Sequence, residues 1–303
     1  MRIFTPTTLA CWGGTGLLWL ILAADWATVS AAEPASAVVQ HDITYAQADG
    51  ESLRCDIYQP ADDGGDSVPV VLIIHGGAWR AGDKWMSVAY AEDLAKRGIA
   101  AVAINYRLAP EHPFPAQVDD VREALIWIAE HARQYGWDRQ RIGVFGYSAG
   151  AHLACMMGTL ADESAATQRA ASDWPASDPR WKNIPSIQAV AAGGAPCEFR
   201  TLPKHNSALA YFLGGTRAEH PATYHAASPT AHGSAGDVPT LFFHGSGDLI
   251  VPLASARSLF EKQCSAGVCS EFLTIDGQGH LMTYIHERSR RAVMGFMEHH
   301  LGR

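Results

Sequence analysis

Residues 141–154 read RIGVFGYSAGAHLA, an apolar run followed by a tight glycine-flanked turn and an alanine-rich segment. The apolar run is typical of a buried strand, and the segment from Ala149 to Leu160 predicts a helix. Gly146 and Gly150 flank Ser148 in the pattern G-x-S-x-G, which needs small residues because the serine backbone is strained and crowded. The pattern therefore predicts that Ser148 is exposed at the turn as a nucleophile.

Backbone donors beside Ser148 are predicted at two places. A helix that begins at Ala149 points its first N–H groups, and the positive end of its dipole, toward an oxyanion at the serine. An earlier strand ends in the sequence HGGAW at residues 75–79, where Gly76 and Gly77 allow the backbone to approach a substrate oxygen closely. Gly76, Gly77 and Ala149 are therefore the candidate oxyanion hole.

Four side chains near these donors have predicted roles. We expect His75 to brace the glycine loop. Trp79 either forms a wall of the acyl or leaving-group pocket or packs in the core. We expect Tyr147 to contact the substrate, and His152, one turn beyond the nucleophile, to pack or hydrogen-bond locally rather than act as a base.

The partners of Ser148 are sought in loops that follow strands, because a parallel sheet gathers its reactive groups at the carboxyl ends of the strands. Asp248 follows the predicted strand at 239–244, and His280 follows the one at 271–275. In this arrangement Ser148 attacks, His280 takes and returns the proton, and Asp248 fixes the imidazole tautomer. The alternative is an ordinary turn aspartate and a surface-loop histidine.

Strand and helix patterns alternate along the chain, which predicts a doubly wound, mainly parallel sheet of about eight strands. We expect a hairpin at its edge, and we read residues 161–185 as a polar surface excursion. The predicted strands are 38–47, 52–58, 70–74, 99–105, 141–147, 187–192, 239–244 and 271–275, and the predicted helices are 86–97, 117–135, 149–160, 207–213, 253–263 and 286–300. Residues 197–238, after the sixth strand, are expected to be an insertion that forms a pocket wall.

The composition limits the classes of protein to consider. The chain has 303 residues, 48% of them hydrophobic and 18% charged, which suits one large α/β domain from residue 33 to 303. The net charge of −8 is not gathered in one block, so no nucleic-acid partner is expected. No phosphate loop or dinucleotide fingerprint occurs, and the 14 histidines have no metal-ligand spacing. We therefore expect neither a cofactor nor a metal, and no feature indicates an oligomeric state.

The N-terminus is typical of a secretory signal peptide. A positive start at Met1 and Arg2 precedes an apolar run at residues 17–24 and small residues at 27–32. The apolar run is too short to span a bilayer as a helix. We expect residues 1–32 to be removed and the mature chain to be secreted or periplasmic, with no stable membrane anchor.

The mature chain would contain five cysteines, an odd number that leaves at least one free thiol. Cys264 and Cys269 flank a loop of four residues, so we expect them to form a disulfide in an oxidising compartment, the alternative being two unpaired thiols. We expect Cys155, on the helix behind Ser148, to be a small buried hydrophobe.

Five motifs together resemble the α/β-hydrolase esterases of the hormone-sensitive-lipase type and the related bacterial feruloyl-esterase-like group. They are HGGAW at 75–79, YRLAPE at 106–111, GYSAG at 146–150, ASP at 227–229 and HGSGD at 244–248. The resemblance runs from about Val38 to the C-terminus and implies an α/β-hydrolase fold. Ala78 replaces the third glycine that is common in these esterases, and the HGGAW and SAGAHL sequences also resemble kynurenine formamidases.

These observations predict an exported serine carboxylesterase that cleaves small-acyl esters through an acyl-enzyme intermediate. One alternative is an arylformamidase that uses the same triad, and another is a non-catalytic binding protein on a hydrolase scaffold. We expect a small ester as the substrate because little sequence precedes the first strand to form a large cap. The glycine-rich and alanine-rich segments 193–195 and 214–215 also offer little apolar wall for a long acyl chain. The alternative is that apolar residues of the insertion fold over the pocket as a lipase-like lid, namely Phe199, Leu202, Tyr211, Phe212 and Leu213.

Overall fold

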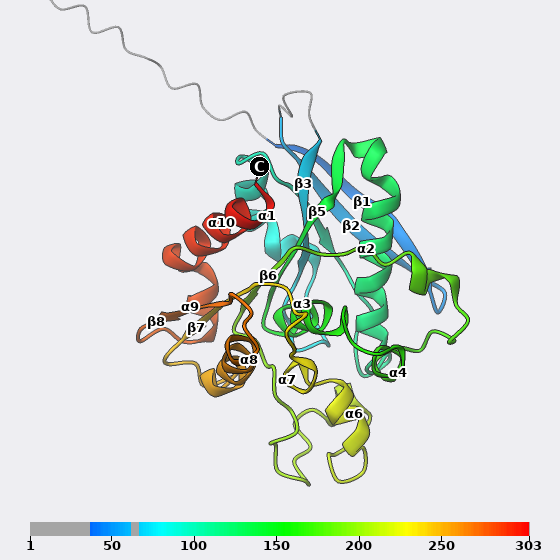
Figure 1. Cartoon of the computed structure of the whole chain (residues 1–303), viewed down its shortest axis with the longest axis vertical. Helices are drawn as coiled ribbons and strands as arrows, with labels where there is room; N and C mark the ends of the chain where they lie inside the picture. The colour runs from blue at the N-terminus through cyan, green and yellow to red at the C-terminus, as the bar shows by residue number, and fades with distance from the viewer. Residues whose placement is uncertain (1–36, 62–66, 303) are drawn as a thin grey trace, which may run out of the picture. The chain divides into compact units, whose positions relative to one another are not determined.

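Continuous apolar runs of the sequence become the central strands of the sheet. The computed structural model describes residues 37–61 and 67–302 (Figure 1). Every residue of β3 (Val68–Ile74), β4 (Ala100–Ile104), β6 (Ala189–Gly193) and β7 (Thr240–Gly245) is buried. A strand buried on both sides needs apolar residues at every position, because helices cover both faces of a parallel sheet.

The eight strands form one sheet in the order β1-β2-β4-β3-β5-β6-β7-β8. The remaining strands are β1 (Val38–Ala48), β2 (Glu51–Gln59), β5 (Trp137–Tyr147) and β8 (Glu271–Ile275). β1 pairs with β2 and β2 pairs with β4 in antiparallel fashion, and all other pairs are parallel. The prediction of a mainly parallel sheet of about eight strands with a hairpin at its edge is confirmed.

Helices cover both faces of this sheet (Figure 1). The helices are η1 (Lys84–Ser87), α1 (Val88–Ala95), α2 (Ala116–Tyr135), α3 (Ala149–Leu160), α4 (Ala165–Ala170), η2 (Pro179–Lys182), α5 (Ala210–Leu213), α6 (Pro221–Ala226), α7 (Pro229–His232), α8 (Leu253–Ser265), α9 (His280–Ile285) and α10 (Glu287–Leu301). The alternation of side chains along β3 divides the core between the two faces. Val70, Leu72 and Ile74 pack with residues of α2 and α3, and Val71 and Ile73 pack with residues of α1 and α10.

Three segments differ from their predicted secondary structure. The predicted helix 86–97 is a 3₁₀ turn, η1, that continues as the shorter helix α1. The excursion 161–185 contains α4 and η2, both capped by polar side chains that the pattern did not reveal. His280 begins the short helix α9 instead of lying in a loop. These helices are too short to produce a clear apolar period, so the sequence carries little signal for them.

The predicted signal peptide, residues 1–32, lies outside the described residues. The described residues belong to one compact unit. None of their helices is both long enough and apolar enough to cross a membrane.

The predicted disulfide between Cys264 and Cys269 is wrong in this structure, where both thiols are free and exposed. The loop between them is already closed by backbone bonds, since the Val268 N–H donates to the Gln263 carbonyl at 3.0 Å and the Gly267 N–H donates to Cys264 at 3.0 Å. This is a helix C-terminal cap, which ends α8 without a covalent link. Cys155 is buried, as expected.

All five thiols of the described residues are free, so five should react when the chain that begins near residue 33, and so lacks Cys11, is denatured without a reductant. The count can be measured with a chromogenic disulfide reagent on aerobically purified protein. A Cys264→Ser variant should lose one thiol. A wild-type count of three would contradict the structure, and peptide mapping would then locate the bond.

Candidate active site

The turn between β5 and α3 places Ser148 at its apex in a strained conformation. Its backbone has φ 55° and ψ −118°, values that side-chain-bearing residues rarely adopt. A Cβ on Gly146 would lie 2.2 Å from the Gly150 carbonyl oxygen, and a Cβ on Gly150 would lie 2.0 Å from the Ile74 carbonyl oxygen. Both contacts are impossible, so only glycine fits at either position and the turn can form only with this sequence pattern.

His280 and Asp248 meet at the same edge of the sheet, as their positions after β8 and β7 predict. Nδ1 of His280 lies 2.6 Å from Oδ2 of Asp248, and both side chains are almost completely buried. Because the carboxylate can only accept, Nδ1 carries the proton and Nε2 is left as a free base. The pair therefore has the orientation that a general base requires.

The imidazole of His280 lies beside the turn that carries Ser148. The Ser148 N–H donates to the Gly193 carbonyl at 2.7 Å, so the turn rests on the end of β6. A Cβ on the next residue, Gly194, would lie 2.8 Å from Cε1 of His280. The absence of a side chain at Gly194, which has φ 57°, thus lets the imidazole approach the serine from the β6 side.

Asp248 is held as an anion by several donors. Burial raises the pKa of its carboxyl, but the hydrogen bond from His280 and the N–H groups of Val251 and Ile250 outweigh this and keep the pKa below its usual value. The two N–H groups donate to Oδ1 at 2.9 Å each. The carboxylate is therefore charged at neutral pH, and Oδ2 remains available to the imidazole.

A second histidine, His244, also faces Asp248 and was missed by the sequence reasoning. Its Nε2 lies 2.9 Å from the Val251 carbonyl and 3.2 Å from Oδ2 of Asp248, so one N–H is shared between two acceptors. Burial lowers the pKa of His244 and keeps it neutral. The signal in the sequence was its place in HGSGD at 244–248, four residues before the aspartate.

The HGGAW loop is braced by His75, as expected. The His75 Nδ1 lies 2.6 Å from the Gly76 carbonyl oxygen, and the ring stacks on Tyr106 with centroids 4.4 Å apart. Gly77, Ala78 and Trp79 all have positive φ, of 121°, 53° and 57°. This left-handed run is closed by the N–H groups of residues 80 and 81, which donate to the Gly77 carbonyl.

The predicted oxyanion donors lie around Ser148. A Cβ on Gly76 would be 3.4 Å from Cβ of Ser148, so the glycine loop and the nucleophile turn are in direct contact. Ala149 is the first residue of α3, where a backbone N–H has no partner within the helix. Ala78, which the prediction did not include, lines the cavity beside Ser148 together with Trp79.

Trp79 and His152 form a buried pair behind the loop. The indole N–H donates to Nδ1 of His152 at 3.2 Å, and Nε2 of His152 lies 2.8 Å from the Ala227 carbonyl. A neutral imidazole with its proton on Nε2 satisfies both contacts, whereas a second proton on Nδ1 would face the indole N–H. Burial accordingly lowers the pKa of His152 to about 4. His152 packs locally, as predicted, and does not act as a base.

A cavity of about 550 Å³ opens beside Ser148. Its walls are mostly apolar and come from the HGGAW loop, the insertion at 197–238 and the start of α8. They include Ala78, Trp79, Pro196, Glu198, Phe199, Thr201, Leu202, Ala208, Leu209, Tyr211, Ile250, Val251, Pro252, Ala254, Ser255 and Ser258. The insertion forms a pocket wall as expected, but the expectation of little apolar wall is wrong, because its aromatic and leucine side chains turn inward.

Tyr147 is not among the residues that line this cavity, and its contact with the substrate stays a prediction. The side chain is buried, and its hydroxyl donates to the backbone carbonyl of His280. Its ring also packs against the imidazole, with centroids 5.2 Å apart. Tyr147 therefore positions the start of α9. Its ring also packs against Phe243 of β7, with centroids 5.8 Å apart.

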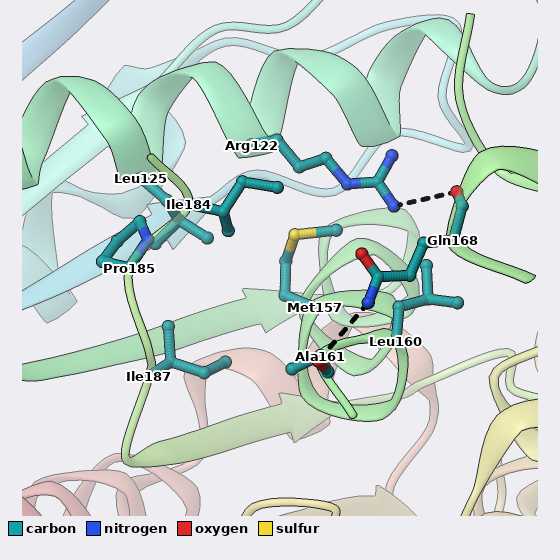
Figure 2. Close-up of a pocket in the computed structure, with 9 residues that line it drawn as sticks. All are labelled: Arg122, Leu125, Met157, Leu160, Ala161, Gln168, Ile184, Pro185 and Ile187. Atoms are coloured by element: carbon teal, nitrogen blue, oxygen red, sulfur yellow. Dashed lines mark hydrogen bonds between the residues drawn. The ribbon is translucent and has the colours of Figure 1, made fainter. Parts of the chain in front are cut away.

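A second cavity, of about 40 Å³, lies between α2, α3 and residues 184–187 (Figure 2). Its one cation, Arg122, is already bonded to Asp119 at 3.0 Å and to the Ala171 carbonyl at 2.8 Å. The volume holds one or two waters, and none of the predicted site residues lines it.

One group of possible metal ligands occurs among the described residues. Oxygen or nitrogen atoms of Glu51, Glu111 and His112 lie within 4.8 Å of one another at the surface. None of the three lines the cavity beside Ser148. Exposed acidic groups of this kind are common without an ion, so this group is not assigned to a site.

Comparisons with known proteins agree with this geometry. A sequence profile of the BD-FAE family matches residues 55–263. Esterase LipC of Mycobacterium tuberculosis is 27% identical over 274 residues, covering 86% of this chain and 65% of LipC. The chain thus spans just under two thirds of that relative, and it spans 30% of the carboxylesterase NlhH from the same organism.

Solved structures with the same fold cover nearly the whole chain. A truncated carbohydrate esterase from gut microbiota superposes with a TM-score of 0.76 at 23% identity, covering 90% of this chain and 99% of the other. Esterase Est2 of Thermogutta terrifontis with propionate bound has a TM-score of 0.71 at 25% identity, covering 88% and 95%. The butyrate-bound form of Est2 also has a TM-score of 0.71.

The lowered pKa of His152 predicts a pH-dependent stability. In the unfolded chain the imidazole binds a proton near pH 6.5, but in the folded protein it does so only near pH 4, so acid favours the unfolded state. This contribution is fully present above pH 6.5 and is lost as the pH falls toward 4. By pH 5 the loss is about 2 kcal/mol relative to pH 7.5.

The measurement is urea unfolding of the wild type and of His152→Gln at both pH values. The difference in unfolding free energy between the two proteins should shrink by about 2 kcal/mol on going from pH 7.5 to pH 5. The control is His205→Gln, at an exposed histidine of the insertion, which should show no such change. An equal difference at both pH values would mean that His152 does not titrate as described.

Proposed function

Because the chain belongs to the BD-FAE family, we propose that it is a serine carboxylesterase that hydrolyses esters of short acyl groups through an acyl-enzyme intermediate. The observation that carries the proposal is the Asp248–His280 pair, joined through Nδ1 of the imidazole, at the sheet edge where Ser148 stands on a strained turn. A nucleophile and an oriented base at one sheet edge are the minimal machinery for acyl transfer.

The proposed reaction follows from the protonation states. Nε2 of His280 takes the proton of the Ser148 hydroxyl as its oxygen bonds to the ester carbonyl carbon. The imidazolium is stabilised by the anionic Asp248 and then gives its proton to the departing alcohol as the carbon–oxygen bond breaks. A water molecule repeats the sequence, giving its proton to His280, and releases the carboxylic acid and the free serine.

The charge on the tetrahedral oxygen needs donors that are already in place. The free N–H of Ala149 at the start of α3 is one of them, and the loop containing Gly76 and Gly77 supplies the others. The packing of His75 on Tyr106 makes this loop rigid. Preorganised donors require no rearrangement during the reaction. The strain of the positive-φ backbone in the loop at residues 77–79 is offset by this advantage.

The short-acyl part of the proposal is supported by the propionate-bound and butyrate-bound forms of Est2. The aromatic walls of the cavity also support it. Trp79 stacks on Phe212 with centroids 4.2 Å apart and packs edge-on against Phe199 at 6.0 Å. Trp79 and Phe199 line the cavity, so a short acyl chain can lie against their rings.

We also propose export, on the signal-peptide pattern of residues 1–32. Mass spectrometry of the protein recovered from an expressing bacterium should find a mature N-terminus near Glu33. Recovery of an intact Met1 from the soluble fraction would contradict export without affecting the proposed activity.

Replacing the nucleophile should abolish the activity and leave the fold intact. Ser148→Ala should lose turnover of 4-nitrophenyl acetate and labelling by a fluorophosphonate, because the hydroxyl is the atom that reacts with both. The matched control is Ser265→Ala, at an exposed serine of α8, which should keep both. Labelling of the Ser148→Ala protein would show that another residue is the nucleophile.

Replacing the base or the acid should cost activity without preventing folding. His280→Ala and Asp248→Asn should each lower kcat by about 10³-fold or more, the former more severely. The control is His286→Ala, at the histidine that caps α10, which should keep a kcat near that of the wild type. A near-normal rate for His280→Ala would leave the role of general base with another histidine.

Acyl-chain length tests the substrate class. With 4-nitrophenyl esters, kcat/KM should be highest between acetyl and butyryl and lower for decanoyl, on the precedent of the propionate-bound and butyrate-bound forms of Est2. Up to that limit each buried methylene contributes about 0.8 kcal/mol. A kcat/KM that still rises at decanoyl would mean that the insertion accommodates long acyl chains. Including N-formylkynurenine in the series tests the arylformamidase alternative.

A further inference from the structure

Large apolar side chains are exposed around the loops that carry His280 and Asp248. We call this set the apolar rim, and its members are Trp85, Met86, Leu249, Ile250, Leu281, Met282 and Ile285. Among the described residues, the one other large hydrophobic side chain that is exposed is Val38, on β1. Exposed apolar residues are usually scattered, so their concentration in three segments at one site indicates a binding surface.

The three segments of the apolar rim lie side by side. Leu249 and Ile250 directly follow Asp248, and Leu281 directly follows His280, whose imidazole is 2.6 Å from the Asp248 carboxylate. A Cβ on Gly247 would lie 3.2 Å from the Gly277 carbonyl, so the loops that precede these segments also touch.

The third segment is joined to the second by α9. The Tyr284 hydroxyl donates to the Met86 carbonyl at 2.9 Å, which places Trp85 and Met86 beside this helix. Leu281 and Ile285 are four residues apart in α9 and share one of its faces, which is exposed. Leu249 is 97% exposed, so folding gains almost nothing from its apolar side chain.

The direction of the reaction assigns a part of the substrate to this surface. The departing oxygen must receive its proton from Nε2 of His280, so the group attached to that oxygen begins beside this histidine. Among the described residues, the cavity of about 550 Å³ is lined by Ser148 and not by any residue of α9. The acyl group therefore fits the cavity, and the alcohol extends from His280 over the apolar rim. Ile250 belongs to both surfaces, which makes them continuous.

We propose that the apolar rim binds the alcohol part of the ester, and that the substrates of this protein are esters of a short acid with a large apolar alcohol. This inference rests on the proposed carboxylesterase function. Seven of the eight large exposed hydrophobic side chains of the described residues belong to the rim, and this hydrocarbon surface suits a hydrocarbon-like alcohol rather than a sugar. Because the apolar rim is an open surface, an extended alcohol can contact it along the whole length of its chain without being enclosed.

The test is a series of acetates in which the alcohol is varied and the acid is constant. Methyl, butyl, hexyl and octyl acetate are compared below the concentration at which any of them forms droplets. Contact with a half-open apolar surface should raise kcat/KM by roughly twofold for each added methylene, about half of the free energy of full burial. The gain should continue over the length of the rim.

Variants of the apolar rim test whether the alcohol part of the ester binds there. Trp85→Gln and Ile285→Gln are chosen because neither residue directly adjoins a triad residue in the sequence, and each should lower kcat/KM for octyl acetate at least five-fold more than for methyl acetate. The matched control is Val38→Gln, which changes an exposed apolar residue outside the rim and should leave the ratio of the two substrates unaltered.

The outcomes separate this inference from the proposed function. Absence of acetate hydrolysis in the wild type would overturn the esterase proposal itself. Hydrolysis with equal kcat/KM for methyl and octyl acetate, or equal losses on both substrates in the rim variants, would overturn only the role of the rim. A rate increase confined to droplet-forming concentrations would instead identify the rim as a lipid-interface surface. Dimers in sedimentation that the rim variants abolish would identify it as a subunit interface.

Discussion

The turn that carries Ser148 has no space for a side chain at the two glycines that flank the serine. A Cβ on Gly146 would meet the Gly150 carbonyl at 2.2 Å, and a Cβ on Gly150 would meet the Ile74 carbonyl at 2.0 Å. This contact fixes the distance between the end of β3 and the start of α3, and with it the approach of the glycine loop to the nucleophile. Because the parallel pairing of β3 with β5 brings both strand ends to one edge, the positions of Ser148 and of the proposed oxyanion donors follow from a single packing constraint.

The acid and the base are held at that edge by a second set of buried contacts. Tyr147, adjacent to the nucleophile, donates to the carbonyl of His280, so the strand that carries Ser148 also positions the helix that carries the base. Asp248 is fixed by two backbone N–H groups and shares Oδ2 between His280 and His244. The neutral His244 adds a donor without adding a charge, which leaves the carboxylate to stabilise the imidazolium of His280 alone.

Much of this arrangement could be predicted because it depends on residue type at fixed spacing. The glycines around Ser148, the buried strands and the order of Asp248 and His280 are local signals, and each corresponds to a physical requirement of the turn or the sheet. Contacts between distant segments could not be predicted. The roles of Tyr147 and His244 depend on which face of a strand end meets α9, and the loop between the free thiols at 264 and 269 is closed by a backbone cap. No single-sequence pattern reports either contact.

The difference between local signals and contacts between distant segments also explains why the pocket wall is more apolar than expected. Glycines and alanines at 193–195 and 214–215 indicated a wall with little apolar surface, but Gly193 and Gly194 are positions where the backbone passes close to its neighbours. Gly193, for example, would place a Cβ 2.2 Å from the Phe243 ring. The side chains that shape the cavity are instead the larger residues between them, such as Phe199 and Tyr211. Small residues therefore mark where chains approach, and the apolar surface available to a substrate is set by the residues that this close approach turns inward.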